Sequence, residues 1–225
     1  MKYLTSLLLI ILYSKSLIAQ KQTSYFFGAG INTFSPKTNF FYAPDIAKYG
    51  EKAEEQNATS RLSPSFEIGL QRDFKRMRLY LGYQTVFYSY NIHPVTIPKS
   101  QEIITRIKFV SHNLNLIPCI KLQDFDIGIG PQFQYLSKPK VESTGNERHN
   151  IYDNNKLSVG LIFQANYNFA LGKHKMNIGY QYSMYMSGKN PITVELVYDN
   201  DYTNYRYFHQ PDFNSHTLRI NYVFN

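Results

Sequence analysis

The chain has 225 residues, enough for a single domain, and its 24 Lys and Arg against 16 Asp and Glu give a net charge of +8. The basic residues are scattered rather than gathered on one face, which argues against a nucleic-acid partner. After residue 20, no apolar run approaches the roughly 20 residues that a membrane-spanning helix needs, so a helical membrane protein is excluded.

Residues 1–19 have the layout of a secretory signal peptide. A positive charge at Lys2 precedes the apolar run Leu7 to Leu12, and the small residue Ala19 stands before Gln20. Export signals combine these features, whereas a membrane anchor would need an apolar stretch about twice as long. The sequence therefore predicts a cleaved signal peptide over residues 1–19 and one exported domain over residues 20–225.

Eight later segments carry apolar residues at every second position, which is the pattern of a strand with one apolar and one polar face. In chain order these segments are Thr23 to Phe34, Leu62 to Gln71, Arg78 to Tyr90, Ile107 to Leu122, Asp126 to Leu136, Lys156 to Leu171, Lys175 to Ser187 and Ser215 to Phe224. The clearest is the sixth, where Leu161 and Phe163 alternate with Gly160 and Gln164.

The polar faces of these segments consist mainly of Gly, Ser, Asn and Gln and carry almost no charge. A water-soluble barrel or sandwich would place its apolar face inward and would solvate its polar face with more Lys and Glu. We therefore expect the apolar faces to contact lipid, with Leu161, Phe163 and Tyr182 outside, and the polar faces to line an enclosed interior. The single cysteine, Cys119, has the parity of the inner face, where a packed thiol is expected.

The connections between segments alternate between short and long. Short turns are predicted at Asp73 to Met77, Gln123 to Phe125 and Leu171 to His174, and long polar loops at Ser35 to Arg61, Asn91 to Arg106, Ser137 to Asn155 and Gly188 to Asn214. Short periplasmic turns and long extracellular loops are typical of transmembrane β-barrels. The pattern predicts an integral outer-membrane protein with both termini in the periplasm.

Together, the signal peptide, the eight segments and the final strand resemble the small outer-membrane β-barrel proteins, a porin-like superfamily that includes OmpA-type, OmpX-type and PorT-like barrels. The resemblance implies an all-β fold, an eight-stranded antiparallel up-and-down transmembrane barrel of the Gram-negative cell envelope. It also implies that the barrel-assembly machinery binds the last strand through Leu218, Ile220, Tyr222 and Phe224. A PorT-like barrel would have an envelope or secretion-complex protein as partner.

Two charged residues have the parity of the inner face. Glu67 lies in the second segment and Arg219 in the eighth, so only the first segment separates them around a closed wall. An unpaired charge in an enclosed interior is costly. We therefore expect Glu67 and Arg219 to form an ion pair that helps to fill the lumen.

The last long loop is rich in aromatic residues, which are favoured at recognition surfaces because they give a large contact area at low entropic cost. The candidates for a surface recognition loop are Tyr198, Tyr202, Tyr205, Arg206, Tyr207 and Phe208. The simpler interpretation, compatible with the first, is a hairpin that extends the seventh and eighth strands above the membrane and includes Ile192 to Val197.

No motif in the sequence predicts a metal, a cofactor or a catalytic centre. The glycine pairs Gly28/Gly30 and Gly128/Gly130 lie within strands rather than before a helix, so they are interpreted as positions that make space in a narrow barrel. A lipid-acting hydrolase is the alternative, because Ser89 and His112 share the outward face of neighbouring strands and a serine nucleophile needs an adjacent base.

The sequence thus predicts a non-enzymatic outer-membrane barrel with a structural, surface-binding or secretion-associated role carried by its extracellular loops. Outer-membrane lipid and lipopolysaccharide are expected to surround it. The alternatives are a narrow regulated pore and the lipid-acting hydrolase. General diffusion of solutes is not expected, because side chains fill the interior of an eight-stranded barrel.

Overall fold

The structure is a computed structural model that describes residues 23–34, 41–42, 57–93, 104–144, 148–153, 157–186, 192–200, 203–209 and 214–224. The regular elements in these ranges are all strands. Within these ranges, no helix has the length and apolarity needed to cross a membrane. The predicted signal peptide, residues 1–19, lies outside the described residues.

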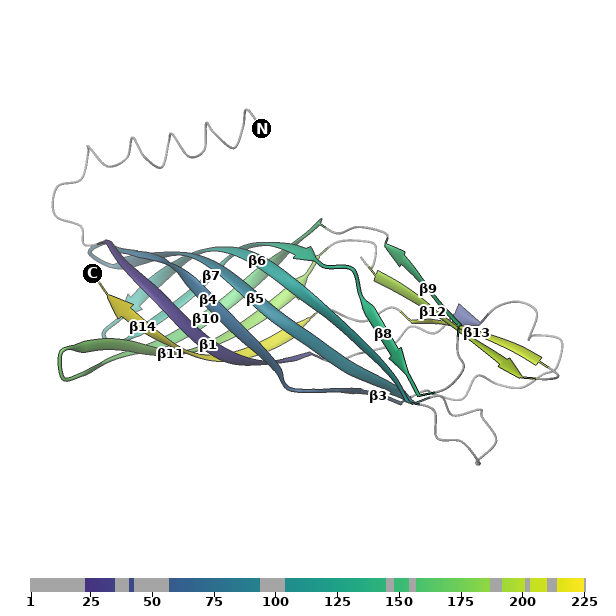
Figure 1. The fold of residues 1–225 in the computed structure, drawn as a ribbon. Helices are drawn as coiled ribbons and strands as arrows, with labels where there is room; N and C mark the ends of the chain where they lie inside the picture. Colours follow the sequence, from purple (N-terminus) through teal and green to yellow (C-terminus); the bar gives the residue numbers. More distant parts are fainter. Residues whose placement is uncertain are drawn as a thin grey trace.

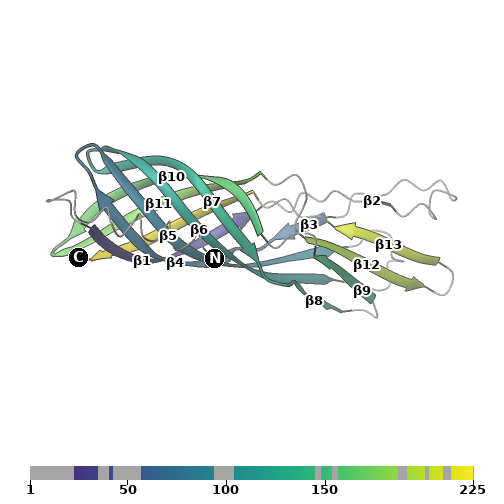
Figure 2. The ribbon, with the colours of Figure 1, turned by 90° about the horizontal axis from the view of Figure 1, so that it is seen from above.

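Eight long strands form a closed antiparallel ring (Figures 1 and 2). In chain order they are β1 (Thr23–Phe34), β4 (Ser63–Asp73), β5 (Met77–His93), β6 (Thr105–Leu122), β7 (Phe125–Leu136), β10 (Leu157–Leu171), β11 (His174–Tyr185) and β14 (Ser215–Phe224). Each strand pairs with the next, and β1 pairs with β14 to close the wall. The predicted eight-stranded up-and-down barrel is confirmed. The largest boundary difference is in β5, which continues to His93 instead of ending at Tyr90.

The polarity of the wall is also as expected from the alternation. Along β6 the burial of side chains alternates at every step, and Leu114, Ile120 and other outward residues are exposed. Phe163 is 41% exposed, and Leu161 and Tyr182 are partly exposed on the same outer face. Cys119 is a free cysteine on the inner face and is fully buried. Apolar side chains therefore cover the outside of the ring, as a lipid environment requires.

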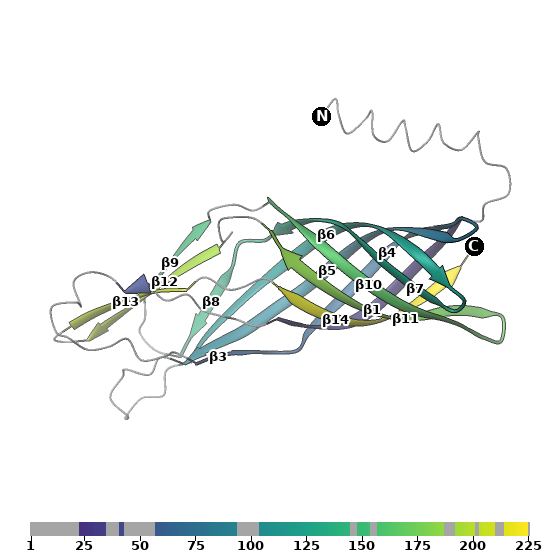
Figure 3. The same ribbon diagram turned by 180° about the vertical axis from the view of Figure 1, so that it is seen from behind.

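One end of the ring carries the three short turns together with the start of β1 and the end of β14 (Figure 3). The tight turn between β10 and β11 contains Gly172 in the left-handed region at φ 61°, and the turn between β6 and β7 contains Gln123 at φ 57°. Glycine adopts this conformation without steric cost, which explains the residue at position 172. Short turns are typical of the periplasmic end of transmembrane barrels, so this end is called periplasmic and the opposite end extracellular.

At the opposite end, a second sheet lies beyond the ring (Figure 1). Its strand order is β2 (Phe41–Tyr42), β13 (Thr203–His209), β12 (Ile192–Asn200) and β9 (Arg148–Asp153). Two further short strands, β3 (Asn57–Ser60) and β8 (Lys140–Ser143), extend the wall next to β5 and β6. The sequence predicts loops at these segments, apart from the hairpin that includes Ile192 to Val197. That hairpin exists as β12 and β13, but it belongs to the separate sheet rather than continuing β11 and β14.

The described ladders of the ring are continuous except between β6 and β7. This ladder pairs Asn115 with Gln132 and resumes at Cys119 with Gly128, and the break contains Pro118 and Pro131. Ser137 N donates to Val110 O and Val110 N donates to Ser137 Oγ, so both amides face this pair of strands. Backbone amides along a strand point to the same side at every second residue. By that parity both proline nitrogens face the β6–β7 seam, so each removes one N–H donor from it.

Candidate functional site

The interior of the barrel holds a buried ion pair. Arg219 Nη1 on β14 pairs with Glu67 Oε2 on β4, and their exposures are 3% and 5%. Arg219 Nη2 also donates a hydrogen bond to Asn166 Oδ1 on β10 at 3.2 Å. The structure therefore brings together the two charged residues that the sequence placed on the lumen face, and it adds Asn166, which the sequence analysis did not single out. The pair and this amide allow two charges to be enclosed side by side.

Side-chain amides bridge the lumen next to this pair. Gln84 Nε2 on β5 donates to Gln181 Oε1 on β11 at 3.1 Å, and Gln181 Nε2 donates to Gln164 Oε1 at the same distance. Strands β5 and β11 stand on opposite sides of the eight-membered ring. A direct hydrogen bond between them means that side chains, rather than an open channel, occupy the axis at this level.

Nearer the extracellular end, the inner face is apolar, which corrects the expectation of a polar lumen throughout. Phe34, Tyr88 and Phe109 are each at most 4% exposed, and the ring centroids of Phe34 and Tyr88 are 4.9 Å apart. The whole cluster comprises Phe34, Val86, Tyr88, Tyr90, Ile92, Ile107, Phe109 and Leu136. Inward packing of these apolar residues closes the extracellular end of the ring.

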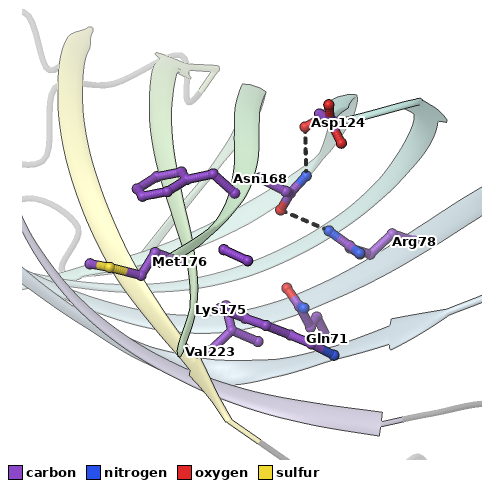
Figure 4. A pocket seen from close by; sticks show the side chains of 9 residues that line it. Gln71, Arg78, Asp124, Asn168, Lys175, Met176 and Val223 are labelled. Atoms are coloured by element: carbon purple, nitrogen blue, oxygen red, sulfur yellow. Dashed lines mark hydrogen bonds between the residues drawn. The ribbon is translucent and has the colours of Figure 1, made fainter. Parts of the chain in front are cut away.

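The periplasmic mouth contains a second charged cluster, which the sequence analysis missed. Arg78 Nε and Nη1 bind Asp73 at 2.5 Å and Asp126 at 2.6 Å, and Nη1 also donates to Asn168 Oδ1 at 2.9 Å. Figure 4 shows Asn168 between Arg78 and Asp124. These residues line a cavity of about 250 Å³. Arg78 and Asp126 have inner-face parity next to short turns, and this was the available signal.

Five of the six predicted recognition residues lie in the small extracellular sheet. Tyr205, Arg206, Tyr207 and Phe208 belong to β13, and Tyr198 belongs to β12 directly opposite Tyr205. Tyr202 lies outside the described residues. The backbone register therefore places five of the six candidates on two paired strands, which join β9 and β2 from other loops in one sheet.

The pair Ser89 and His112 does not form a nucleophile and base. Thr85, not Ser89, stands opposite His112, and Ser89 stands opposite Lys108 further along β6. His112 Nδ1 is instead 2.7 Å from the hydroxyl of Tyr83, and its ring lies against Tyr135. Two similar contacts, His216 with Tyr180 and His174 with Tyr222, occur elsewhere on the outer face. Rings of this kind are typical of the aromatic girdles at membrane interfaces.

Within the described ranges, no group of three or more His, Cys, Asp or Glu side chains could hold a metal ion. The glycine pairs interpreted as space-making positions lie against neighbouring backbone. A side chain at Gly30 would lie 2.7 Å from Leu218 O, and one at Gly128 would lie 2.5 Å from Pro118 O. The space-making interpretation is confirmed at both positions.

No protein-family model matches the sequence, and no curated protein is matched. Among solved structures, the outer membrane protein OprG from Pseudomonas aeruginosa is 12% identical with a TM-score of 0.53, and the match covers 92% of this chain and 98% of OprG. Ail, the attachment invasion locus protein of Yersinia pestis, is 12% identical with a TM-score of 0.34 and coverages of 92% and 100%. Neisserial surface protein A is 12% identical with a TM-score of 0.34 and coverages of 90% and 99%.

At this identity the similarity to OprG concerns the fold alone. In this chain the ring is closed, its short turns lie at one end, and its outer face carries apolar side chains. A surface of this kind requires a lipid environment. The chain is therefore, by fold and by surface, an integral outer-membrane protein of the small β-barrel type.

Proposed function

We propose that the protein is a non-enzymatic, non-conducting barrel whose extracellular sheet performs its role, either in binding at the cell surface or in an envelope or secretion complex. The observation that carries this proposal is the filled interior. The Gln84–Gln181 hydrogen bond spans the ring, and the apolar cluster around Phe34, Tyr88 and Phe109 occupies its extracellular end. A barrel filled in this way serves as an anchor rather than as a route for solutes.

The extracellular sheet supports the same proposal. Its strands come from three different loops, β2 from the first, β9 from the third, and β12 with β13 from the fourth. Backbone pairing between loops limits their freedom before any partner binds, and such preorganisation favours recognition. The aromatic residues of β12 and β13, Tyr198, Tyr205, Tyr207 and Phe208, are the proposed contact residues, together with Arg206 and Tyr202.

The proposed partners in the membrane are outer-membrane lipid, including lipopolysaccharide, and the barrel-assembly machinery. The machinery would contact the last strand through Leu218, Ile220, Tyr222 and Phe224. Three of these four, Leu218, Ile220 and Phe224, are between 43% and 60% exposed on the outer face. No nucleic-acid partner is proposed.

Planar-bilayer conductance of the purified full chain tests the anchor role. We expect no steady openings, whereas reproducible openings would favour the narrow regulated pore. Incubation with radiolabelled phospholipid and lipid A tests the hydrolase alternative. We expect no product, and a product lost in Ser89→Ala would overturn the non-enzymatic proposal.

A variant in which residues 192–209 are replaced by a short Gly-Ser turn tests the role of the sheet. We expect this variant to insert as a folded barrel, judged by its heat-dependent gel mobility. It should fail to correct the envelope defect of cells that lack the protein. Full restoration by the shortened variant would contradict the proposal.

A further inference from the structure

A groove lies on the outer face of the wall at its extracellular end. It has a volume of about 280 Å³, and its lining includes Phe87, Ser89, Lys108, Val110, Lys138 and Lys140. Strand pairing brings these residues to one level, because Lys108 stands opposite Ser89 on β5 and opposite Lys140 on β8. The groove therefore combines an apolar floor with three lysines.

The height of the groove follows from the outward residues of β6. Leu122 and His112 are ten positions apart, which at about 3.3 Å per residue and a tilt of about 40° spans roughly 25 Å, the height of the apolar band of such barrels. Lys108 lies four positions beyond His112 on the same face, or about 10 Å further out by the same geometry. The lysines therefore reach the level of the lipid headgroups while the floor remains continuous with the lipid-facing surface.

The charge in the groove is positive but partly compensated. Lys108 Nζ donates a hydrogen bond to Glu142 at 2.7 Å, and the two side chains are 42% and 52% exposed. This hydrogen bond lowers the pKa of Glu142, so its carboxylate is a persistent competitor for Lys108. Lys138 and Lys140 are exposed and form no direct ion pair within the part of the chain that the structure describes, although the charge of Lys140 also acts on Glu142. Two ammonium groups thus remain available beside the apolar floor.

We propose that this groove binds a phosphorylated lipid of the outer leaflet. The phosphate contacts the ammonium groups of Lys138 and Lys140, with Lys108 shared between it and Glu142, and an acyl chain lies along Phe87 and Val110. Lysine binds phosphate as a point charge, and basic residues at a membrane surface attract anionic headgroups. The proposal rests on the orientation with the long loops outside, but it does not depend on whether the lumen conducts.

The test uses the purified full chain in a neutral detergent and measures the retention of diphosphoryl lipid A by native mass spectrometry. Lys138→Gln and Lys140→Gln are each expected to weaken binding about fivefold, the effect of one interfacial basic residue. Glu142→Gln is expected to strengthen binding, because it frees Lys108. Lys173→Gln, in the exposed turn at the periplasmic end, is the matched control and should bind as the wild type does.

Lipid A from which both phosphates have been removed should bind more weakly to the wild type and equally to all variants. Equal retention of the diphosphoryl lipid by wild type and groove variants would overturn the proposal, as would an equal loss in Lys173→Gln. Conductance measured on the same preparation reports separately on the proposed anchor role.

Discussion

Arg219 and Glu67 form an ion pair across a strand to which neither belongs. On β1, Gly30 stands opposite Arg219 and Gly28 stands opposite Glu67, so both long side chains pass over glycines to meet. Other glycines border the pair, since a side chain at Gly82 would lie 2.5 Å from Glu67 Oε1 and one at Gly179 would lie 3.0 Å from Arg219 Nε. The glycines therefore leave the room that the side chains of Glu67 and Arg219 occupy at this level of the lumen.

Removing one partner of this pair is expected to destabilise the barrel strongly. Glu67→Gln leaves Arg219 enclosed without a carboxylate, and Arg219→Met leaves Glu67 without a cation. Breaking a buried pair from one side costs about 3 kcal/mol or more in the free energy of unfolding. The double variant leaves no charge, so its loss should be smaller than the sum of the two single losses.

Urea unfolding of the protein in phospholipid vesicles measures these losses. The chain contains 20 Tyr and no Trp, so tryptophan fluorescence cannot follow its unfolding. Gel mobility and far-ultraviolet circular dichroism are the suitable signals. Lys173→Gln, which removes a charge from an exposed turn, should unfold with the wild type. Strictly additive losses in the double variant would show that the two side chains act independently.

The ring was predictable because lipid imposes a simple rule on each strand. Every residue that faces hydrocarbon must be apolar, so apolar residues such as Leu114, Ile120 and Phe163 occur at every second position of their strands. The pairing of Glu67 with Arg219 could be anticipated from the same parity, once the first and last strands were assumed to close the wall. Lipid contact and closure of the wall act on every strand, so both can be read from the alternation of apolar and polar residues.

The apolar cluster around Phe34, Tyr88 and Phe109 and the extracellular sheet could not be predicted from the sequence in this way. In β5, Phe87 faces outward and Tyr88 faces inward, so two successive aromatic residues hide the alternation. At this end of the wall the inner face is apolar as well as the outer face, so the polar and apolar positions no longer alternate. The small sheet pairs short segments that are distant in the chain, such as β2 with β13, and neither strand predicts its partner.

The apolar cluster predicts an unequal sensitivity of inward and outward phenylalanines. Phe34 is 2% exposed and contacts Tyr88, Tyr90 and Phe109, with ring centroids between 4.9 and 6.4 Å apart. Phe34→Ala should lower the free energy of unfolding by about 3 kcal/mol or more, the cost of a cavity in a packed core. Phe133→Ala on the outer face, where the residue is 48% exposed, should cost less because lipid can fill the space. Equal losses in urea unfolding would contradict the closed upper cluster.

Two glycines predict unequal costs for the same substitution. At Gly130 an added Cβ would lie 2.9 Å from Leu116 C and 3.0 Å from Ile117 Cα, both backbone atoms of the neighbouring strand. Gly130→Ala must therefore separate β6 from β7, at a cost of about 3 kcal/mol. At Gly172 nothing lies within 4 Å, and only the positive φ of 61° opposes a side chain. Gly172→Ala should cost about 1 kcal/mol, and a larger loss there than at Gly130 would refute the close approach of the strands.

The break between β6 and β7 predicts local opening of the wall. Pro118 and Pro131 each remove one donor from this ladder, whereas the β10–β11 ladder pairs without interruption from Gly160–Tyr185 to Leu171–His174. One missing hydrogen bond weakens local protection by about 1 kcal/mol, or roughly fivefold in exchange rate. Backbone amides beside the break should therefore exchange at least about fivefold faster than those of β10 and β11.

Hydrogen exchange followed by mass spectrometry in lipid nanodiscs measures this difference, with the β10–β11 peptides as the internal reference. Pro131→Ala restores an N–H that faces Leu116 across the seam, so it should slow exchange in the β6–β7 peptides and leave the reference unchanged. If the variant exchanges as the wild type does, the missing donors do not determine the opening. In that case the close approach of Gly130 to Leu116, rather than the loss of hydrogen bonds, would control how firmly this seam is held.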